Sequence, residues 1–165
     1  MEPCRKTGSS PSLKHGLGRC VMKVLVIDGM GGSIGSQIVS RLREALPEET
    51  EIEVLGTNAV ATANMMKAGA NRGASGENAF RVTAPGADLI IGPVGISIPD
   101  SFMGELSPAM AEAVSLSPAK KLLLPLTQPG IEIVGAKGQP LPHLLDEAVE
   151  LIKLTLGIEE VKERV

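Results

Sequence analysis

The sequence predicts a three-layer α/β fold with a short, mainly parallel sheet of four to five strands, Rossmann-like at its first strand-turn-helix unit. Short apolar runs alternate with segments of helical periodicity, which is typical of strands joined by crossover helices. The first apolar run ends in a glycine-rich turn at residues 29–35. Tryptophan and tyrosine are absent and phenylalanine occurs twice, which indicates a core of aliphatic side chains in closely packed layers.

Residues 22–165 are expected to form a single α/β domain, because a chain of 165 residues with 43% hydrophobic content suits one core. Residues 1–21 mix glycine, serine, proline and basic residues without periodicity, so we expect a disordered leader. A methionine directly before the first strand makes a start-site artefact one explanation and a dispensable tail the other. Both cysteines, Cys4 and Cys20, lie in this leader, which excludes thiol chemistry from the rest of the chain.

The net charge of −3 argues against nucleic acid as a partner. The leader is basic, so the remaining chain is more acidic than the whole, and it lacks both a basic stripe and aromatic stacking residues. No apolar run approaches the roughly 18 residues that span a bilayer, and no signal-peptide core follows the basic leader. We therefore expect a cytoplasmic protein without membrane partners.

The first half of the chain predicts two strand-helix units, with strands at residues 23–28 and 52–55 and helices at residues 32–46 and 59–68. Apolar residues recur at helical spacing in the first helix. Thr57 or Asn58 is expected to N-cap the second helix, and Gly69 to end it in a left-handed conformation.

The middle of the chain begins with a polar glycine-bearing loop at residues 71–78, where Ser75 is expected to cap a short helix that ends at Thr83. A third strand is predicted at residues 88–91. The connection that follows, to Gly104, mixes glycine, proline and apolar residues, which favours an ordered loop over a site or an interface.

The last third predicts a helix from Ser107 to about residue 116, a serine cap being followed by proline. A leucine-rich fourth strand at residues 121–126 is expected to be buried on both faces. Residues 131–134 follow too closely for a helical crossover and predict an antiparallel edge strand or hairpin. The final helix begins at residues 140–142 and should pack these residues inward: Leu144, Leu145, Ala148, Leu151 and Ile152.

The candidate site lies at the carboxyl edge of the sheet, where open α/β folds bind ligands. Four segments should meet there: the glycine turn, residues 57–58, the loop at residues 92–104 and residues 127–128. The first helix would point its free amides and positive dipole end into that space, so we expect a phosphate-bearing ligand rather than a purely structural turn. The expected ligand contacts are Gly29, Gly31, Gly32, Ser33, Gly35, Thr57 and Asn58.

The spacing Gly29-x-x-Gly32-x-x-Gly35 resembles the turn of extended short-chain dehydrogenases and sugar-nucleotide epimerases, a resemblance that implies NAD or NADP. Two features oppose a dehydrogenase. The chain has no tyrosine for the acid/base pair of those families, and Thr57 and Asn58 stand where an acidic residue would bind ribose. NAD(P) or another nucleotide is therefore a candidate cofactor, and its identity stays open.

Asp28 at the mouth of the turn has two interpretations, because a carboxylate there repels a pyrophosphate unless a cation or hydrogen bonds offset it. It either contacts a metal or hydroxyl, or it caps the loop amides. Asp28, Asp100 and Glu105 are the candidates for acid/base or metal chemistry.

Three basic residues and one histidine are weaker candidates. Lys67, Arg72 and Arg81 could form an anion site, although we expect them to face solvent or a subunit. His143 has no second histidine or cysteine beside it outside the leader, so no tetrahedral metal site is predicted.

Longer segments of the chain resemble a bacterial family of unknown function, found chiefly in anaerobic Firmicutes. The resemblance rests on I-D-G-M-G-G-S-I-G at residues 27–35, on residues 56–79, and on A-D-L-I-I-G-P-V-G-I at residues 87–96. It continues in G-E-L-S-P-A-M-A-E-A and S-P-A-K-K-L-L-L-P-L. The resemblance implies no activity and no catalytic residues.

Three functions remain in view at this point. The leading one is a small protein that binds a nucleotide or phosphorylated metabolite through the glycine turn. The second is a non-enzymatic assembly or regulatory protein, which the sparse supply of catalytic side chains suggests, with a homodimer or other homo-oligomer as its state. The third is a small hydrolase or transferase that uses a divalent cation.

Overall fold

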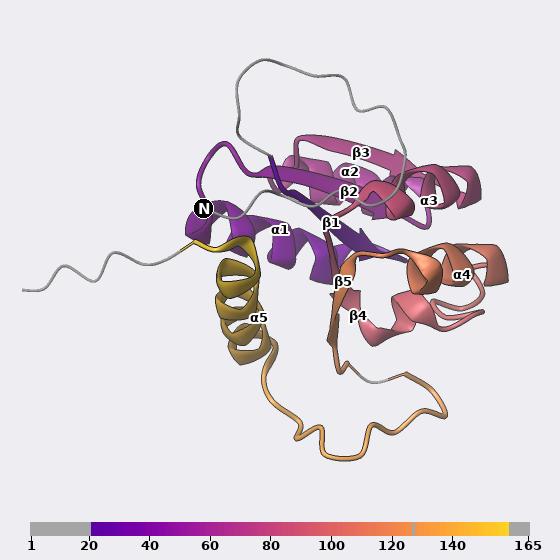
Figure 1. Cartoon of the computed structure of the whole chain (residues 1–165). Helices are drawn as coiled ribbons and strands as arrows, with labels where there is room; N and C mark the ends of the chain where they lie inside the picture. Colours follow the sequence, from indigo (N-terminus) through magenta and orange to yellow (C-terminus); the bar gives the residue numbers. More distant parts are fainter. Residues whose placement is uncertain (1–20, 127, 159–165) are drawn as a thin grey trace, which may run out of the picture.

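The structure, a computed structural model, describes residues 21–126 and 128–158. Its centre is one sheet of five parallel strands in the order β3-β2-β1-β4-β5 (Figure 1). The strands are β1 Lys23–Asp28, β2 Glu51–Gly56, β3 Arg72–Ser75, β4 Leu89–Pro93 and β5 Lys120–Leu124. This order is the doubly wound Rossmann arrangement, so the predicted fold class is confirmed. The expectations for the leader before Val21, for Thr127 and for the tail after Ile158 lie outside the described residues.

Helices cover both faces of the sheet and complete the three layers. They are α1 Ser33–Ala45, α2 Ala59–Lys67, α3 Glu77–Thr83, α4 Pro108–Leu116 and α5 Leu141–Leu156, with short 3-10 turns η1 Ala84–Gly86 and η2 Val94–Ser97. Buried residues of α1, α2 and α5 share one core with one face of the sheet. Buried residues of α3 and α4 share a second core with the other face.

Strand β1 belongs to both cores because side chains alternate across a strand. Val24 and Val26 face the α1 side, Leu25 and Ile27 face the α4 side, and none of the four is accessible to solvent. A strand between two parallel neighbours is buried on both faces, which explains its unbroken apolar sequence. The match between predicted and observed bounds of β1 follows from this run and the glycine that ends it.

Strand β3 lies where the sequence predicts a polar loop, so that expectation is wrong. Its four residues are all exposed, and it pairs along β2 with Val54 opposite Gly73. An edge strand can be held by backbone pairing alone, without the apolar residues that reveal a strand in sequence. Ser75 also does not cap α3: its hydroxyl lies 2.7 Å from the Thr62 hydroxyl, and Gly76 is the N-cap.

Strand β5 is not buried on both faces, because it lies at the other edge of the sheet. Leu124 is 4% exposed, whereas its neighbour Leu123 is 37% exposed. The strand predicted at residues 131–134 is also wrong: the described residues form only an isolated antiparallel bridge between Gln128 and Ile131. A run of leucines therefore indicated the strand correctly but not its place in the sheet.

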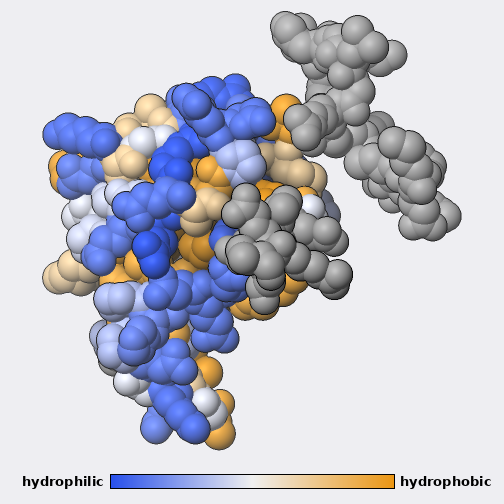
Figure 2. Space-filling view, turned by 90° about the vertical axis from the view of Figure 1, so that its left-hand side faces the viewer, coloured by the Kyte–Doolittle hydropathy of each residue, from blue (hydrophilic) through white to orange (hydrophobic). Residues whose placement is uncertain are grey.

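Helix α5 packs against α1, and Figure 2 shows this side of the molecule with a predominantly hydrophilic surface. The helix buries Val149 in addition to four of the five residues expected to face inward, whereas Leu151 is 40% exposed. Arg41 of α1 pairs with Asp146. Within the described part of the chain, no helix combines the length and the apolar character needed to cross a bilayer.

Replacing Leu124 with alanine should lower the free energy of unfolding by about 2–5 kcal/mol, because the change leaves a cavity in the core. Leu123→Ala is the matched control on the opposite face of the same strand, and its loss should be clearly smaller. Urea denaturation measures both. Equal losses would mean that Leu123 is as well covered as Leu124 and would contradict the exposure of this face of β5.

Candidate functional site

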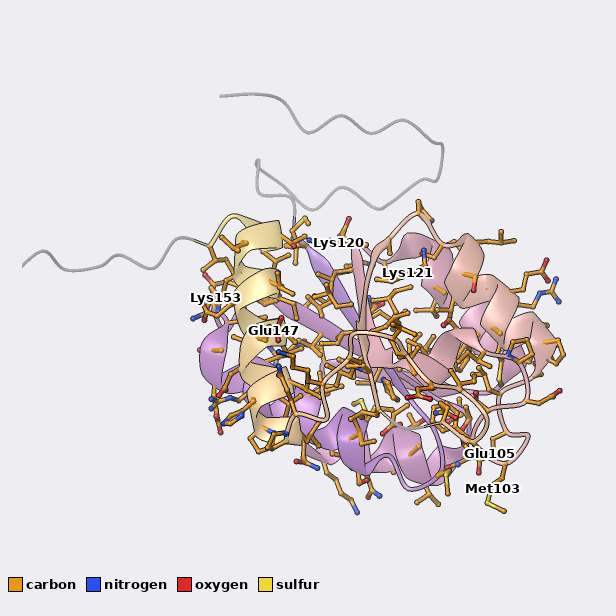
Figure 3. The ribbon with its side chains drawn as sticks, turned by 90° about the horizontal axis from the view of Figure 1, so that it is seen from below. Met103, Glu105, Lys120, Lys121, Glu147 and Lys153 are labelled. Carbon is orange, nitrogen blue, oxygen red and sulfur yellow. The ribbon has the colours of Figure 1, made fainter. Side chains whose placement is uncertain are left out.

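The candidate site lies where β1, β2 and β4 end. The strand order reverses between β1 and β4, and in open parallel sheets this reversal leaves a crevice beyond the carboxyl ends of the strands. Figure 3 places Met103 and Glu105, from the connection between β4 and α4, at the opposite end of the sheet from Lys120 at the start of β5. The structure therefore brings this connection to the edge at which the glycine turn and Thr57 lie.

Asp28 closes the glycine turn from inside. Its side chain, 3% exposed, accepts hydrogen bonds from the amides of Gly29 at 2.8 Å and Gly35 at 2.7 Å. Of the two interpretations of this residue, the structure shows the cap on the loop amides. Burial raises the pKa of Asp28 and Glu105 raises it further, while the amides of Gly35, Gly29 and Ile34 act against this rise.

Three glycines of the turn are required by packing. A Cβ at Gly29 would lie 2.7 Å from the ring of Phe102, and one at Gly32 would lie 2.7 Å from the backbone of Ala61. A Cβ at Gly35 would lie 2.8 Å from Cβ of Asp28. Gly32 also has a φ of +67°, which favours glycine. These glycines therefore have a structural cause, whether or not a phosphate binds.

Gly31 differs from the other three, because an added Cβ would meet nothing within 4 Å. Gly31 and Ser33 are exposed at the outer side of the turn. The carbonyl of Gly31 accepts a hydrogen bond from Asn64 of α2 at 2.9 Å, which ties the turn to its neighbour. The turn is thus held to α2 by a hydrogen bond, while Gly31 and Ser33 remain exposed to solvent.

Glu105 brings together residues that are far apart in sequence. Its Oε2 accepts hydrogen bonds from the Met30 amide at 2.8 Å, from the Asn58 side-chain amide at 2.9 Å and from the Thr57 hydroxyl. The Thr57 bond is the largest cause of a lowered pKa of Glu105, and the Met30 and Asn58 bonds act in the same direction. A single carboxylate oxygen therefore occupies a position built from donors of two different loops.

Asn58 has two functions at this position. Its Oδ1 accepts from the Ala61 amide at 2.9 Å and so caps α2, as predicted for either Thr57 or Asn58. Its Nδ2 donates to the Met30 carbonyl as well as to Glu105. The cap holds the amide group in place, so its N–H groups point toward the glycine turn.

Phe102 fills the crevice under Glu105. Its ring lies against Gly29 on one side, and a Cβ at Gly95 would lie 3.4 Å from the ring on the other. A Cβ at Gly95 would also collide with the Gln128 side chain, so Gln128 reaches the same place. Neither Phe102 nor Gly95 was a candidate from sequence, because nothing in their spacing links them to Gly29.

The segment that carries Phe102 and Glu105 has an unusual backbone. Asp100, Phe102 and Met103 have φ values of +63°, +58° and +58°, and Gly104 has +89°. Met30, which faces them from the glycine turn, has a φ of +50°. Left-handed residues other than glycine cost about 1 kcal/mol each and persist where the surroundings hold them. The contacts of Glu105 and Phe102 hold this segment against the glycine turn, and backbone hydrogen bonds within the segment hold its shape.

Three exposed apolar side chains belong to residues at or near the polar centre in the chain. Met30 is 50% exposed, Val60 is 62% exposed and Met103 is 92% exposed. Met30 donates its amide to Glu105, Met103 lies two residues from Glu105, and Val60 lies two residues after Asn58. Flexible methionine side chains adapt to the shape of a ligand or partner.

The remaining candidates do not join this centre. Asp100 is exposed, and its amide donates to the Leu106 carbonyl at 2.8 Å within its own loop. Arg72 of β3 forms ion pairs with Glu51 and Glu53 of β2, which raise its pKa. Its positive charge is therefore neutralised by carboxylates of the neighbouring strand. Among residues 21–126 and 128–158, no group of three histidine, cysteine, aspartate or glutamate residues is placed to hold a metal ion.

A second cleft, of about 470 Å³, lies between the end of β5 and α5. Its walls include Leu122, Leu144 and Leu151, with Lys137 and Glu147 as charged residues. Figure 3 shows Glu147 on α5, far from Glu105. This cleft is therefore separate from the carboxyl edge of the sheet, and the edge itself is filled by Phe102 and Glu105.

The family model "Domain of unknown function (DUF3842)" matches residues 23–157, so the chain belongs to this family. None of the curated proteins compared with the chain matches it significantly. The resemblance to a family of unknown function is confirmed. Because the family brings no activity, the function has to be argued from the site.

Two solved structures are similar to the chain. One is a dodecameric FMN-dependent Ubix-like decarboxylase from Escherichia coli O157:H7, with 16% identity over 87% of this chain and 98% of that chain and a TM-score of 0.41. The other is a universal stress protein in complex with cAMP, with 22% identity over 64% of this chain and 98% of that chain and a TM-score of 0.37.

Gly32→Ala should destabilise the fold strongly, by about 2 kcal/mol or more, because the new Cβ collides with the Ala61 backbone and φ is positive. Gly31→Ala, in open space, should change the free energy of unfolding by no more than about 0.5 kcal/mol. Chemical denaturation measures both. Two equally mild effects would show that Gly32 is not required by packing.

Asp28→Asn should destabilise the protein, because the amide nitrogen cannot accept and one buried N–H loses its partner, at about 1–3 kcal/mol. The raised pKa adds a pH dependence. The contribution of Asp28 to stability is fully present below its ordinary pKa and is lost as the pH rises through its folded value. The stability gap between wild type and variant should therefore narrow as the pH rises above the ordinary pKa of an aspartate. A gap that widens would mean that the amides outweigh burial.

Proposed function

We propose that this DUF3842 protein binds a nucleotide or another phosphorylated small molecule at the carboxyl edge of its sheet. The observation that carries the proposal is the convergence of the Met30 amide, the Thr57 hydroxyl and the Asn58 side-chain amide on one carboxylate oxygen. Donors that satisfy a carboxylate oxygen also satisfy a phosphate oxygen, because both are charged acceptors of similar size. Their place at the strand-order reversal supports the proposal.

The position of the phosphate differs from that in a dinucleotide fingerprint. Asp28 already takes the amides of Gly29 and Gly35, the groups that would face a pyrophosphate. We place the anionic group one step further out, between Met30, Thr57 and Asn58. Gly31 and Ser33, exposed on the same turn, extend the polar surface.

The rest of the ligand would lie on the apolar side chains around this position. Met30, Val60 and Met103 offer a flexible apolar surface beside the donors. A base or ring attached to a phosphate has this combination of an apolar face and an anionic group. NAD(P) remains one candidate ligand, together with other nucleotides. We still expect the protein to be bacterial and cytoplasmic.

A second function is favoured by a separate observation. Val134 is 99% exposed, Leu154 is 77% exposed and Leu123 is 37% exposed, on or near the open edge formed by β5 and α5. An assembly or regulatory protein that forms a homo-oligomer would cover such side chains. The third function, a metal-dependent hydrolase or transferase, has no comparable support among the described residues.

Thermal unfolding in the presence of NAD, NADP, ATP, GTP, FAD or inorganic phosphate tests the proposed function. A ligand at 100 times its dissociation constant stabilises the folded state by about 2.7 kcal/mol, which appears as a raised Tm. Thr57→Val removes one donor without changing the shape of the side chain and should weaken binding about tenfold. Thr83→Val at the end of α3 is the matched control and should bind like the wild type. The absence of stabilisation by every compound at millimolar concentration would overturn the proposal.

A further inference from the structure

We propose further that Glu105 is a built-in occupant of the anion position and that residues 101–105 form a lid that the ligand must release. The inference rests on the proposed function and adds a competition: the ligand's anionic group and the Glu105 carboxylate use the same donors. Only one of them can be bound at a time.

The first support is that all the contacts meet at one atom. Met30, Thr57 and Asn58 each donate to Oε2 of Glu105. Glu105 is itself exposed, so this is a surface contact that solvent and a ligand can both reach. Interactions of exposed charges are weak and easily exchanged, which suits a reversible contact better than a structural one.

The second support is that the lid has a fixed base. At the base, the Asp100 amide donates to the Leu106 carbonyl at 2.8 Å and the Leu106 amide donates to Ser101 at 3.2 Å. Leu106 is fully buried, and Ser107 caps α4 through the Met110 amide. Between these ends the amides of Gly104 and Glu105 donate to the carbonyls of Asp100 and Phe102 at 3.1 Å and 3.2 Å, so the tip would move as one turn while both of its ends stay anchored.

The third support is the conformation of the tip. Phe102, Met103 and Gly104 all have positive φ values, and so does Asp100 at its start. Ligand sites and switch regions are where such backbone strain is found, and opening the tip would relax it. Met103 is 92% exposed, so its side chain does not hold the tip. The tip is held by Glu105, by Phe102 and by its own turn hydrogen bonds from the Gly104 and Glu105 amides.

The charge around the position selects the ligand. The groups that bind Glu105 are all neutral donors, and the buried Asp28 carboxylate is near enough to be repelled by Glu105. An exchange that conserves charge replaces one carboxylate with a group of one negative charge. A bridging phosphate carries about one negative charge, in NAD and FAD as in ATP and GTP, whereas a terminal or inorganic phosphate carries about 1.5 to 2. We therefore expect a bridging phosphate of a nucleotide such as NAD to bind in preference to inorganic phosphate.

Glu105→Ala and Glu105→Gln test the lid, with Glu112→Ala and Glu112→Gln on the exposed side of α4 as matched controls. The first measurement is hydrogen exchange of the Met30 amide in the full chain without ligand. Exchange should be at least threefold faster in Glu105→Ala, because Met30 loses its acceptor, and unchanged in the Glu112 variants. Glu105→Gln keeps a side-chain oxygen that can accept from Met30, so its exchange should rise less than that of Glu105→Ala. Unchanged exchange in Glu105→Ala would overturn the lid, whatever binds.

The second measurement is the dissociation constant for NAD and for inorganic phosphate. Without its competitor, Glu105→Ala should bind NAD about tenfold more tightly than the wild type, and more tightly than it binds phosphate. If the wild type binds NAD and Glu105→Ala binds it equally or more weakly, Glu105 is a structural or ligand-supporting residue. That result would overturn the competition between Glu105 and the ligand. If the Met30 amide exchanges faster in Glu105→Ala but neither the wild type nor the variant binds NAD or phosphate, the proposed function and the competition are both overturned. The contact between Glu105 and Met30 would still be established.

Discussion

The hydrogen bonds of Asp28 to the amides of Gly29 and Gly35 are the interaction on which the carboxyl edge depends. They join the end of β1 to the start of α1 across the glycine turn. Asp28 binds the amides of Gly29 and Gly35, whereas the Met30 amide between them donates to Glu105. The polar centre at the edge of the sheet therefore uses an amide of the turn that Asp28 leaves available.

This arrangement changes the meaning of the glycine turn. In a dinucleotide-binding protein the glycines let a pyrophosphate approach the helix, and the helix dipole helps to bind it. Here the missing side chain of Gly29 leaves room for the ring of Phe102. In the same way Gly32 leaves room for the backbone of α2, and Gly35 leaves room for Asp28. The helix start is occupied by a carboxylate of the same chain. The donors that remain for a ligand come from the tip of the turn and from the start of α2.

Elements with a strong local signal could be predicted from sequence, and those with none could not. An apolar run against glycines defines β1, and serine followed by proline defines the start of α4, where the Ser107 hydroxyl caps the helix as expected. The exposed residues Arg72–Ser75 give no such signal, because β3 is held by backbone pairing with β2. The edge position of β5 depends on the strand order, which a run of leucines does not reveal.

The candidate site also combines residues with a local signal in the sequence and contacts that have none. Asp28, Thr57, Asn58 and Glu105 were candidates from sequence, because each follows a strand or lies on the long connection after β4. That Glu105 meets Thr57 and Asn58, which precede it by 48 and 47 positions, depends on the packing of two loops. The part played by Phe102 was not predictable, because it follows from the space left by Gly29 and Gly95.

An NMR titration of the full chain with NAD shows whether an anionic ligand replaces Glu105 while Asp28 stays in place. Replacement of Glu105 should give saturable shifts of the Met30 amide and the Asn58 side-chain amide, with the Gly35 amide, which binds Asp28, unchanged. A shift of the Gly35 amide without one at Met30 would place the ligand at the helix start and rule out the replacement. No saturable shift at either residue would rule it out as well.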